Sequence, residues 1–416
     1  MDQHRAVVIG GGIGGLTAAV ALHQRGWAVT VLERAPALSP VGAGLGLTPN
    51  AQRALDVIGL GDTVRSLSAW QGDGGLRAPG GRWLSRTSGE AAADRFGGPV
   101  VLVHRATLIS LLASALPEGV VCTGTAATLT DPGGDGRRAQ VTAPDGGAWE
   151  ADLVVGADGI NSSVRRALFP GHPGPRYSGF TTWRLVVPAP ERPFAPHETW
   201  GRGRLWGTQP LKDGRVYAYA MALAPADAHA PDDEQAELLR LFGDWHEPVP
   251  RIIRAAEPGR ILRHDVHEMR VPLPAHHHGR TALLGDAAHA MQPTVGQGGN
   301  QAIEDAVVLA HHAGPGHAGP GHATPATPDP PTTPGIPAAL AAYSAARLPR
   351  TTAIARQAAR TGRMIAVTSP AAAVLRDSAI ATVSRLVPGL LLRGFAGIAD
   401  WRPPARTYAA GTAHPS

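Results

Sequence analysis

The sequence has almost none of the residues that form disulfides and sulfur-rich metal sites. Its 416 residues include a single cysteine, Cys122, which excludes an internal disulfide and any site with several cysteine ligands. Histidines cluster at residues 276–278 and 311–322, but neither cluster has cysteines or carboxylates at ligand spacing. We therefore expect no metal site.

Lysine and long apolar runs are also scarce. Lys212 is the only lysine, so the formal net charge of +5 comes from scattered arginines that form no basic block. Such a distribution gives no support to a nucleic-acid partner. No uncharged apolar run reaches the roughly 18 residues of a transmembrane helix, and no signal peptide is expected ahead of the first apolar run near residue 6. We expect a cytoplasmic protein without a membrane partner, either a monomer or a homodimer.

Glycine is abundant instead, with 52 residues, and its first cluster interrupts a regular pattern. The apolar run 7–9 predicts a strand, residues 17–25 a helix, and residues 28–32 a second strand that ends at Glu33. This order is that of the βαβ unit that binds dinucleotides, in which the acid accepts hydrogen bonds from a ribose. The segment therefore predicts a dinucleotide site rather than a glycine-rich turn without a ligand.

The glycines of this turn have distinct expected roles. Gly10 allows the tight turn, Gly12 lets the backbone approach a pyrophosphate, and Gly15 lets the helix pack close to the strand. Ile13 and Gly14 lie between them at the predicted helix start. The N–H groups of that helix N-terminus would face the phosphates.

Two later apolar strands also end in acids. Asp158 follows the run 153–155, and Asp286 follows the run 281–284. Ligands of α/β sheets bind at the carboxyl ends of the strands, so both acids are more consistent with function than with structure alone. Residues 296–300 (Gly-Gln-Gly-Gly-Asn) open the next predicted helix and offer further backbone N–H groups to an electron-rich ligand.

Two other positions are consistent either with ligand binding or with a purely structural role. Arg105 lies where the strand 100–104 gives way to a helix, and it is either a phosphate-binding cation or a solvated helix-start arginine. Gly46 belongs to a run of alternating glycines that either admits a flat ligand or forms a plain bulged strand.

The middle of the chain has a different pattern, typical of an antiparallel sheet with helices. Tyr217 and Tyr219 lie two apart on one predicted strand and therefore share a face, which either lines an aromatic pocket or packs in a core. The expected strands are residues 179–187, 198–200, 205–208 and 215–223, and the expected helices are 232–245 and 248–256. A strand is also expected over residues 120–129.

Taken together, the motifs resemble the FAD-dependent aromatic hydroxylase family, the single-component flavoprotein monooxygenases with the p-hydroxybenzoate hydroxylase fold. Salicylate-hydroxylase-like and urate-hydroxylase-like members are the most similar. The resemblance spans nearly the whole chain. It rests on residues 10–15 with Glu33, His104-Arg105, residues 156–159, residues 285–289, and Pro293 with residues 296–300.

This resemblance implies an α/β fold: a Rossmann-like FAD-binding domain with an inserted, mostly antiparallel sheet as the substrate domain and a C-terminal helical region. The implied ranges are 1–175 and 276–310 for the FAD-binding domain, 176–275 for the substrate-binding domain, 311–337 for a disordered Pro/Gly/His insertion, and 338–416 for C-terminal helices.

The resemblance also assigns roles. Residues 10–15 and Glu33 would hold the ADP half of FAD, with Arg34 beside the adenine. Arg105 and Asp286 would contact the pyrophosphate and ribityl chain, and Asp158 would belong to a motif associated with FAD and NAD(P)H. The expected FAD-binding residues are Gly10, Gly12, Ile13, Gly14, Gly15, Glu33, Arg34, Gly46, Arg105, Asp158, Asp286, Gly296, Gln297, Gly298, Gly299 and Asn300.

By the same resemblance, NAD(P)H reduces FAD, dioxygen forms a flavin C4a-hydroperoxide, and one oxygen atom enters an aromatic or polycyclic small molecule. Pro293 would lie beside C4a. Tyr217 matches a tyrosine that urate-hydroxylase-like members use for substrate, and Arg204 matches their arginine only if one residue is inserted. His197 and Arg184 are further candidates for the substrate side.

Other interpretations stay open at this stage. The same fold could catalyse epoxidation or Baeyer–Villiger oxidation. Flavin halogenation is disfavoured, because those enzymes depend on a lysine beside the flavin and the only lysine, Lys212, lies in a predicted turn. A non-enzymatic flavin-binding protein is the remaining alternative.

Overall fold

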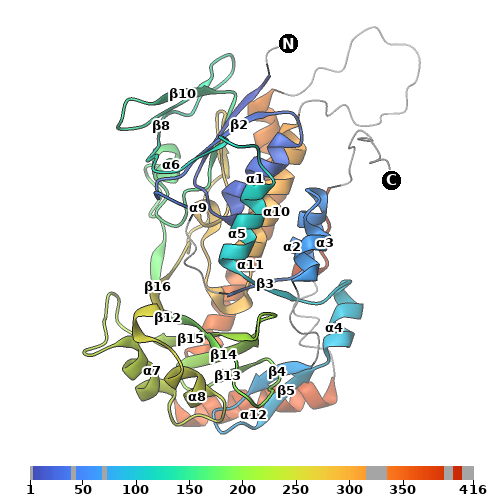
Figure 1. Ribbon diagram of the computed structural model, residues 1–416, viewed down its shortest axis with the longest axis vertical. Coiled ribbons are helices and arrows are strands. Elements are labelled where there is room, and N and C mark those ends of the chain that lie inside the picture. Colours follow the sequence, from blue (N-terminus) through green and yellow to red (C-terminus); the bar gives the residue numbers. More distant parts are fainter. Residues whose placement is uncertain (1–2, 39–43, 68–72, 315–334, 388–396, 405–416) are drawn as a thin grey trace.

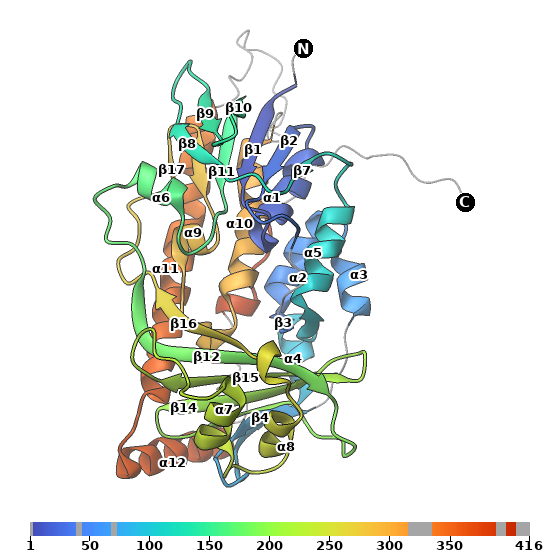
Figure 2. The same cartoon turned by 60° about the vertical axis from the view of Figure 1, so that its left-hand side comes forward.

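A computed structural model describes residues 3–38, 44–67, 73–314, 335–387 and 397–404. The chain forms an upper part around a parallel sheet and a lower part around an antiparallel sheet (Figure 1). A long helix, α11 (Ile336–Ile365), runs along both parts, and α12 (Pro370–Leu386) packs beneath the lower sheet against its edge strand (Figures 1 and 2).

The upper part contains a six-stranded sheet in the order β17-β18-β11-β1-β2-β7. Five neighbouring strands, β18, β11, β1, β2 and β7, run parallel, so their carboxyl ends meet at one edge. The strands are β1 (Arg5–Ile9), β2 (Ala28–Leu32), β7 (Val121–Cys122), β11 (Leu153–Gly156), β17 (His277–His278) and β18 (Thr281–Leu283). Their apolar side chains and those of α1 (Ile13–His23) and α10 (Gly298–Ala313) form the largest buried core.

Shorter elements surround this sheet. The helices are α2 (Pro49–Val57), α3 (Gly61–Ser66), α4 (Gly89–Phe96), α5 (Arg105–Ser114), α6 (Ser163–Leu168) and α9 (Asp286–His289), with a 3-10 turn η2 (Pro293–Val295). A two-stranded sheet joins β3 (Gly44–Leu47) to β6 (Val101–His104), and a three-stranded sheet joins β8 (Thr128–Asp131), β9 (Ala139–Thr142) and β10 (Ala148–Ala151). The strand expected over 120–129 is therefore wrong: it is split between β7 and β8, which belong to different sheets.

The lower part contains a seven-stranded sheet in the order β16-β12-β15-β14-β13-β4-β5. Its strands are β4 (Gly74–Arg77), β5 (Trp83–Thr87), β12 (Arg176–Pro188), β13 (His197–Trp200), β14 (Arg204–Pro210), β15 (Arg215–Leu223) and β16 (Leu262–Glu268). Helices α7 (Glu234–Phe242) and α8 (Val249–Arg254) and a 3-10 turn η1 (Pro258–Arg260) follow β15 in the chain. Both helices cover the face that points away from the upper part, as Figure 2 shows.

This sheet takes two strands from outside the expected range 176–275. β4 pairs in parallel with β13, with Gly75 opposite His197, and β5 pairs with β4. A pairing between residues more than a hundred positions apart leaves no local pattern in the sequence, so it could not be foreseen.

The expected insertion begins later and ends earlier than 311–337. α10 continues to Ala313 and α11 begins at Ile336, because both helices bury apolar residues at these ends. The remainder of that insertion, residues 315–334, lies outside the described residues, as do residues 388–396 and 405–416 of the expected C-terminal helices.

Candidate cofactor and active site

The turn between β1 and α1 requires glycine at two positions. Gly10 has φ +112°, and a Cβ there would collide with the carbonyl oxygen of Ala157 on the neighbouring strand. A Cβ at Gly15 would collide with the carbonyl oxygen of Gly10, so the helix packs directly on the turn. Gly12, the N-cap of α1, has no atom within 4 Å of where a Cβ would stand. It leaves space in front of a helix N-terminus that no side chain caps.

The two residues between these glycines are packed inward. Ile13 is buried in the core, and a Cβ at Gly14 would meet the side chains of Leu284 and Ala302 at 2.6 and 3.1 Å. Both therefore anchor α1 against β18 and α10, and only their backbone N–H groups are placed to face a ligand.

Glu33 holds the glycine turn in place from the end of β2. Its Oε2 accepts a hydrogen bond from the Gly11 N–H at 2.7 Å, and its Oε1 accepts one from the Ala35 N–H at 2.8 Å. Each carboxylate oxygen can accept a second bond, so ribose contacts remain compatible with this arrangement. Arg34 is exposed beside it.

Asp158 follows β11 and caps α6 with only one of its oxygens. Oδ2 accepts hydrogen bonds from the N–H and hydroxyl of Ser163 at 2.7 and 3.0 Å and from the N–H of Val164 at 3.2 Å. Oδ1 is buried and has no partner among the described residues. A buried carboxylate oxygen without a donor is costly, so this atom fits a site completed by a ligand donor.

Asp286 and the start of α10 lie side by side at the same sheet edge. Asp286 is exposed at the N-terminus of α9, and its Oδ1 would lie 3.8 Å from a Cβ at Gly298. Gly296 has φ +61° and open space around it, while Gly299 faces Leu45 of β3. The backbone N–H groups at this helix N-terminus are thus available beside an acid.

Gln297 and Asn300 use their side chains within the protein. Asn300 donates to the carbonyl oxygens of Gly46 and Gly296 at 2.9 and 2.7 Å and accepts from the N–H of Thr48 at 3.0 Å. Gln297 is fully buried and bonds to the side chains of Thr48 and Asn50. These amides fix β3 against α10, so their side chains hold the loops of the site in place.

Two arginines without partners point to a common region. Arg105 at the start of α5 and Arg184 on β12 have neither a hydrogen bond nor an ion pair within the described part of the chain. Burial lowers the pKa of Arg105, the charge of Arg184 lowers it further, and Asp286 opposes both. Burial followed by the charges of Arg184 and Arg105 also lowers the pKa of His264 on β16. These mutual effects indicate that the four side chains lie within range of one another's charges.

Tyr217 borders this region from β15. Its ring is buried against Gly44 of β3, where a Cβ would collide with it, and its centroid lies 5.5 Å from that of Tyr219. Burial raises the pKa of Tyr217 to about 12, although the charge of Arg184 opposes the shift. The Tyr219 hydroxyl donates to Glu198 at 2.6 Å. The Tyr217 hydroxyl has no hydrogen-bond partner among the residues that the structure describes.

Arg204 and His197 lie on the other face of the lower sheet. Arg204 stacks over the rings of Phe242 and Trp245 at 5.9 and 5.6 Å, on the α7 side. His197 is buried 5.2 Å from the ring of His246. The expected catalytic role of Arg204 is therefore wrong: its strand position faces the packing helices and not Tyr217. Pro293 is exposed at the start of η2, and its carbonyl oxygen accepts the N–H of Gly296 at 2.9 Å.

A buried ionic cluster behind the site was not expected from the sequence. Arg347 of α11 is 1% exposed and bonds to Glu304 and Asp305 of α10, both at 2.6 Å. Asp305 also bonds to Nε2 of His289 at 2.5 Å and accepts the N–H of Gly285 at 2.9 Å. The cluster thus supports the loop that carries Asp286. The signal for it was present, since Glu304 and Asp305 interrupt the otherwise apolar run 302–310.

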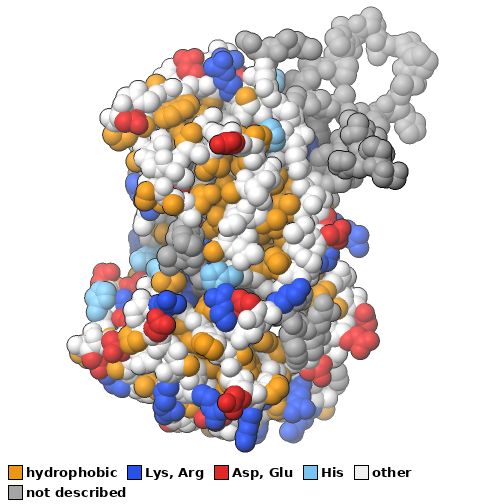
Figure 3. Space-filling model, in the orientation of Figure 1, with side chains coloured by type: hydrophobic (Ala, Val, Ile, Leu, Met, Phe, Trp, Pro, Cys, Tyr) orange, Lys and Arg blue, Asp and Glu red, His pale blue; other side chains and the backbone are white. Residues whose placement is uncertain are grey.

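Figure 3 shows arginine, lysine and histidine side chains gathered along the waist where the upper and lower parts meet. Over the described ranges, no group of three or more His, Cys, Asp or Glu residues could hold a metal ion. In the same ranges, none of the helices has the length and apolar character needed to cross a bilayer.

Comparisons with known proteins agree with this arrangement. The sequence model of the "FAD binding domain" family matches residues 3–313. The chain is 40% identical over 306 residues to aurachin C monooxygenase/isomerase of Stigmatella aurantiaca, covering 73% of this chain and 79% of that protein. It is 35% identical over 371 residues to 3-amino-4-hydroxybenzoate 2-monooxygenase of Streptomyces cremeus, covering 86% of both.

Among solved structures, HpxO of Klebsiella pneumoniae in complex with FAD and uric acid is similar, with a TM-score of 0.82 and 27% identity over 95% of this chain and 97% of that one. The α/β fold predicted from the sequence and the FAD cofactor are confirmed. The chain belongs to the FAD-dependent aromatic hydroxylase family and is an FAD-dependent monooxygenase.

Proposed function

We propose that the protein uses NAD(P)H and dioxygen to insert one oxygen atom into an aromatic or polycyclic small molecule that carries an ionisable hydroxyl group or another anionic group. The observation that carries this proposal is Arg184 beside the hydroxyl of Tyr217: within the described residues, neither group has a hydrogen bond or an ion pair. A positive region with a neutral hydrogen-bond donor favours an anionic, electron-rich substrate.

The residues around the glycine turns fit FAD. Gly10, Gly12 and Gly15 leave a cradle at the N-terminus of α1, and the unpartnered Oδ1 of Asp158 is ready to accept a donor. Arg105 and Asp286 would contact the pyrophosphate and ribityl chain, and the N-terminus of α10 would face the electron-rich edge of the flavin. A bound flavin supplies the redox chemistry that side chains lack, accepting a hydride and activating dioxygen.

The protein's own groups would act on the substrate. Because the pKa of Tyr217 is raised to about 12, its hydroxyl keeps its proton at neutral pH and can donate to a substrate oxygen. Arg184 shares the face of Tyr217, since it pairs with Tyr219 across the strands. Its charge would stabilise the ionised form of the substrate, which is the more reactive form toward an electrophilic oxygen. The packed sheet beneath these groups would exclude water.

The names of the relatives support an aromatic substrate class. One relative is named for an aminohydroxybenzoate, and one structure holds uric acid. The oxygen-transfer route that the family resemblance implies stays a prediction, as do Pro293 beside the flavin and the domain ranges given above.

The test is the rate of NADH and NADPH oxidation by the FAD-loaded protein with a panel of phenols, aromatic acids and purines, under ¹⁸O₂. We expect a substrate that stimulates the rate and yields a product with one labelled oxygen. Arg184→Gln should lower the stimulated rate about tenfold or more, consistent with a lost charge-assisted contact. Arg204→Gln is the matched control and should not affect it. Stimulation without label in the product would refute oxygen insertion, and no stimulation by any panel member would refute the proposed substrate class.

A further inference from the structure

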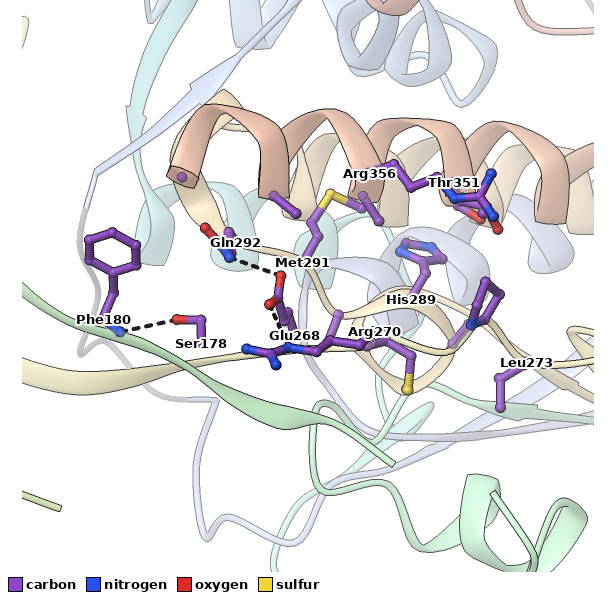
Figure 4. Close-up of a pocket in the computed structure, with 18 of the residues that line it drawn as sticks. Ser178, Phe180, Glu268, Arg270, Leu273, His289, Met291, Gln292, Thr351 and Arg356 are labelled. Carbon is purple, nitrogen blue, oxygen red and sulfur yellow. Dashed lines mark hydrogen bonds and ion pairs between the residues drawn. The ribbon is translucent and has the colours of Figure 1, made fainter. Parts of the chain in front are cut away.

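A cavity of about 490 Å³ lies apart from the candidate site, between α11, the carboxyl end of β16 and the loop that joins α9 to η2 (Figure 4). None of Arg105, Arg184, Tyr217 and Asp286 lines it. Its volume falls within the roughly 300–1,000 Å³ typical of small-molecule sites. Nothing in the proposed function uses this space.

The inner end of the cavity has two buried histidines with unused ring nitrogens. His276 and His289 are 1% and 5% exposed, their rings lie 5.7 Å apart, and the Nδ1 of each has no partner among the described residues. His289 directs Nε2 at the Asp305 carboxylate at 2.5 Å, so that nitrogen carries the proton. Burial lowers the pKa of His276 to about 3, so its ring is neutral. A neutral ring nitrogen without hydrogen accepts a hydrogen bond.

The outer end is positively charged. Arg356 and Arg363 are seven residues apart on α11, which places them on one face of the helix. Both are exposed, and neither has a hydrogen bond or an ion pair within the described part of the chain. The acid at this end, Glu268, is already matched, because Arg270 and Gln292 donate to it at 3.0 and 2.9 Å. Figure 4 shows Arg356 on α11 near His289, with Glu268 and Arg270 across the cavity from the helix.

Apolar side chains supply much of the remaining lining. They include Phe180 of β12, Met291 of the loop and Ala355 of α11. The cavity therefore presents an apolar middle, a cationic mouth and an inner end that can accept hydrogen bonds. Such a combination binds a ligand in one orientation.

We propose that this cavity is a second ligand site, for an elongated apolar molecule with an anionic group at one end and a hydroxyl or N–H donor at the other. The anion pairs with Arg356 and Arg363, and the donor satisfies the ring nitrogen of the neutral His276. Met291 and Gln292 line the cavity and directly precede Pro293. An occupant therefore contacts the loop that leads into the candidate reaction centre.

The test measures binding of 6-hydroxy-2-naphthoate to the FAD-loaded protein by titration calorimetry. This probe has a carboxylate, an apolar body and a hydroxyl in that order. We expect saturable binding, weakened tenfold or more by the double variant Arg356→Gln/Arg363→Gln. Arg360→Gln is the matched control, because Arg360 lies on the same helix but is not among the residues that line the cavity. It should leave the affinity unchanged. 2-Naphthoate, which lacks the hydroxyl, should bind several-fold more weakly.

Two further variants locate the probe. Ala359→Phe fills the cavity and should abolish binding, whereas Arg184→Gln, at the candidate active site, should leave it intact. The reverse pattern would place the probe at the active site and overturn the proposal, as would the absence of saturable binding. If Ala359→Phe fails to fold, the Arg356→Gln/Arg363→Gln and Arg184→Gln variants still distinguish the cavity from the active site as the place where the probe binds. Their side chains are exposed or half-buried, so these variants should fold.

Discussion

Replacement of Arg347 by methionine tests whether the buried ionic cluster stabilises the fold and the FAD loop together. Arg347 lies between α10 and α11 and is 1% exposed, and its guanidinium contacts Glu304, Asp305 and the side chain of Gln301. Methionine keeps the unbranched apolar stem of the side chain but removes the guanidinium group and with it every donor. The variant therefore leaves two buried carboxylates with fewer partners.

The expected loss follows from what remains. Breaking a buried ion pair by removing one partner costs about 3–5 kcal/mol. Glu304 keeps Arg350 and Asn50, and Asp305 keeps His289 and the N–H of Gly285. Because both acids retain donors, we expect the loss of unfolding free energy to lie at the low end of this range, at about 3 kcal/mol. The weakened support of Gly285 should also raise the dissociation constant for FAD.

The assay is urea unfolding followed by tryptophan fluorescence, with FAD affinity measured by flavin fluorescence quenching. The control is Arg240→Gln, which breaks an exposed pair with Asp232 and should change neither quantity measurably. A loss below 1 kcal/mol for Arg347→Met would show that the cluster contributes little net stability. An unchanged FAD affinity alongside a large loss would separate the cluster from the cofactor loop.

Three other outcomes are expected. Gly10→Ala should lose FAD, because φ at Gly10 is +112° and the new Cβ would collide with a carbonyl oxygen. The control Gly26→Ala, at a residue with φ +83° and open space around it, should retain FAD. Equal flavin content in the two variants would contradict this interpretation. Tyr217→Phe should lower substrate-stimulated turnover about tenfold and leave flavin content unchanged, and loss of flavin instead would assign Tyr217 a packing role. Burial lowers the pKa of His197 to about 4 in the folded chain. Below pH 6.5, His197 is therefore protonated in the unfolded chain but stays neutral in the folded chain. Stability should fall between pH 7 and 5, and His197→Phe should reduce that fall by about 2 kcal/mol in urea unfolding; an identical fall would show that His197 is not kept neutral.

The local motifs of the upper part could be read from the sequence because each is fixed by nearby residues. The glycines of the first turn, the acid at Glu33 and the acids at Asp158 and Asp286 all follow strands whose apolar runs are unmistakable. A parallel sheet brings the ends of such strands to one edge, whatever the connections between them. Their convergence was therefore predictable without contacts.

The roles of the Gln297 and Asn300 side chains could not be predicted from the sequence. Both belong to the glycine-rich segment that opens α10, and a motif gives no information on where a side chain points. The structure directs their amides at Gly46 and Thr48, more than two hundred positions away in the chain. Their side chains set the position of a distant backbone segment, and only these long-range contacts reveal that role.

For Arg204, the pairing register of its strand determines which face of the sheet the side chain occupies. β14 and β15 form a hairpin in which Gln209 lies opposite Tyr217 and Arg204 lies opposite Ala222. Side chains alternate between the faces of a sheet, so a residue five positions from Tyr217 along β15 points to the other face, and its partner points with it. The adjacent strand places Arg184 opposite Tyr219, on the face of Tyr217. From residue types alone, both Arg204 and Arg184 were candidates for contacting the substrate. The register favours Arg184, because a cation can act on a substrate only from the sheet face that the substrate contacts.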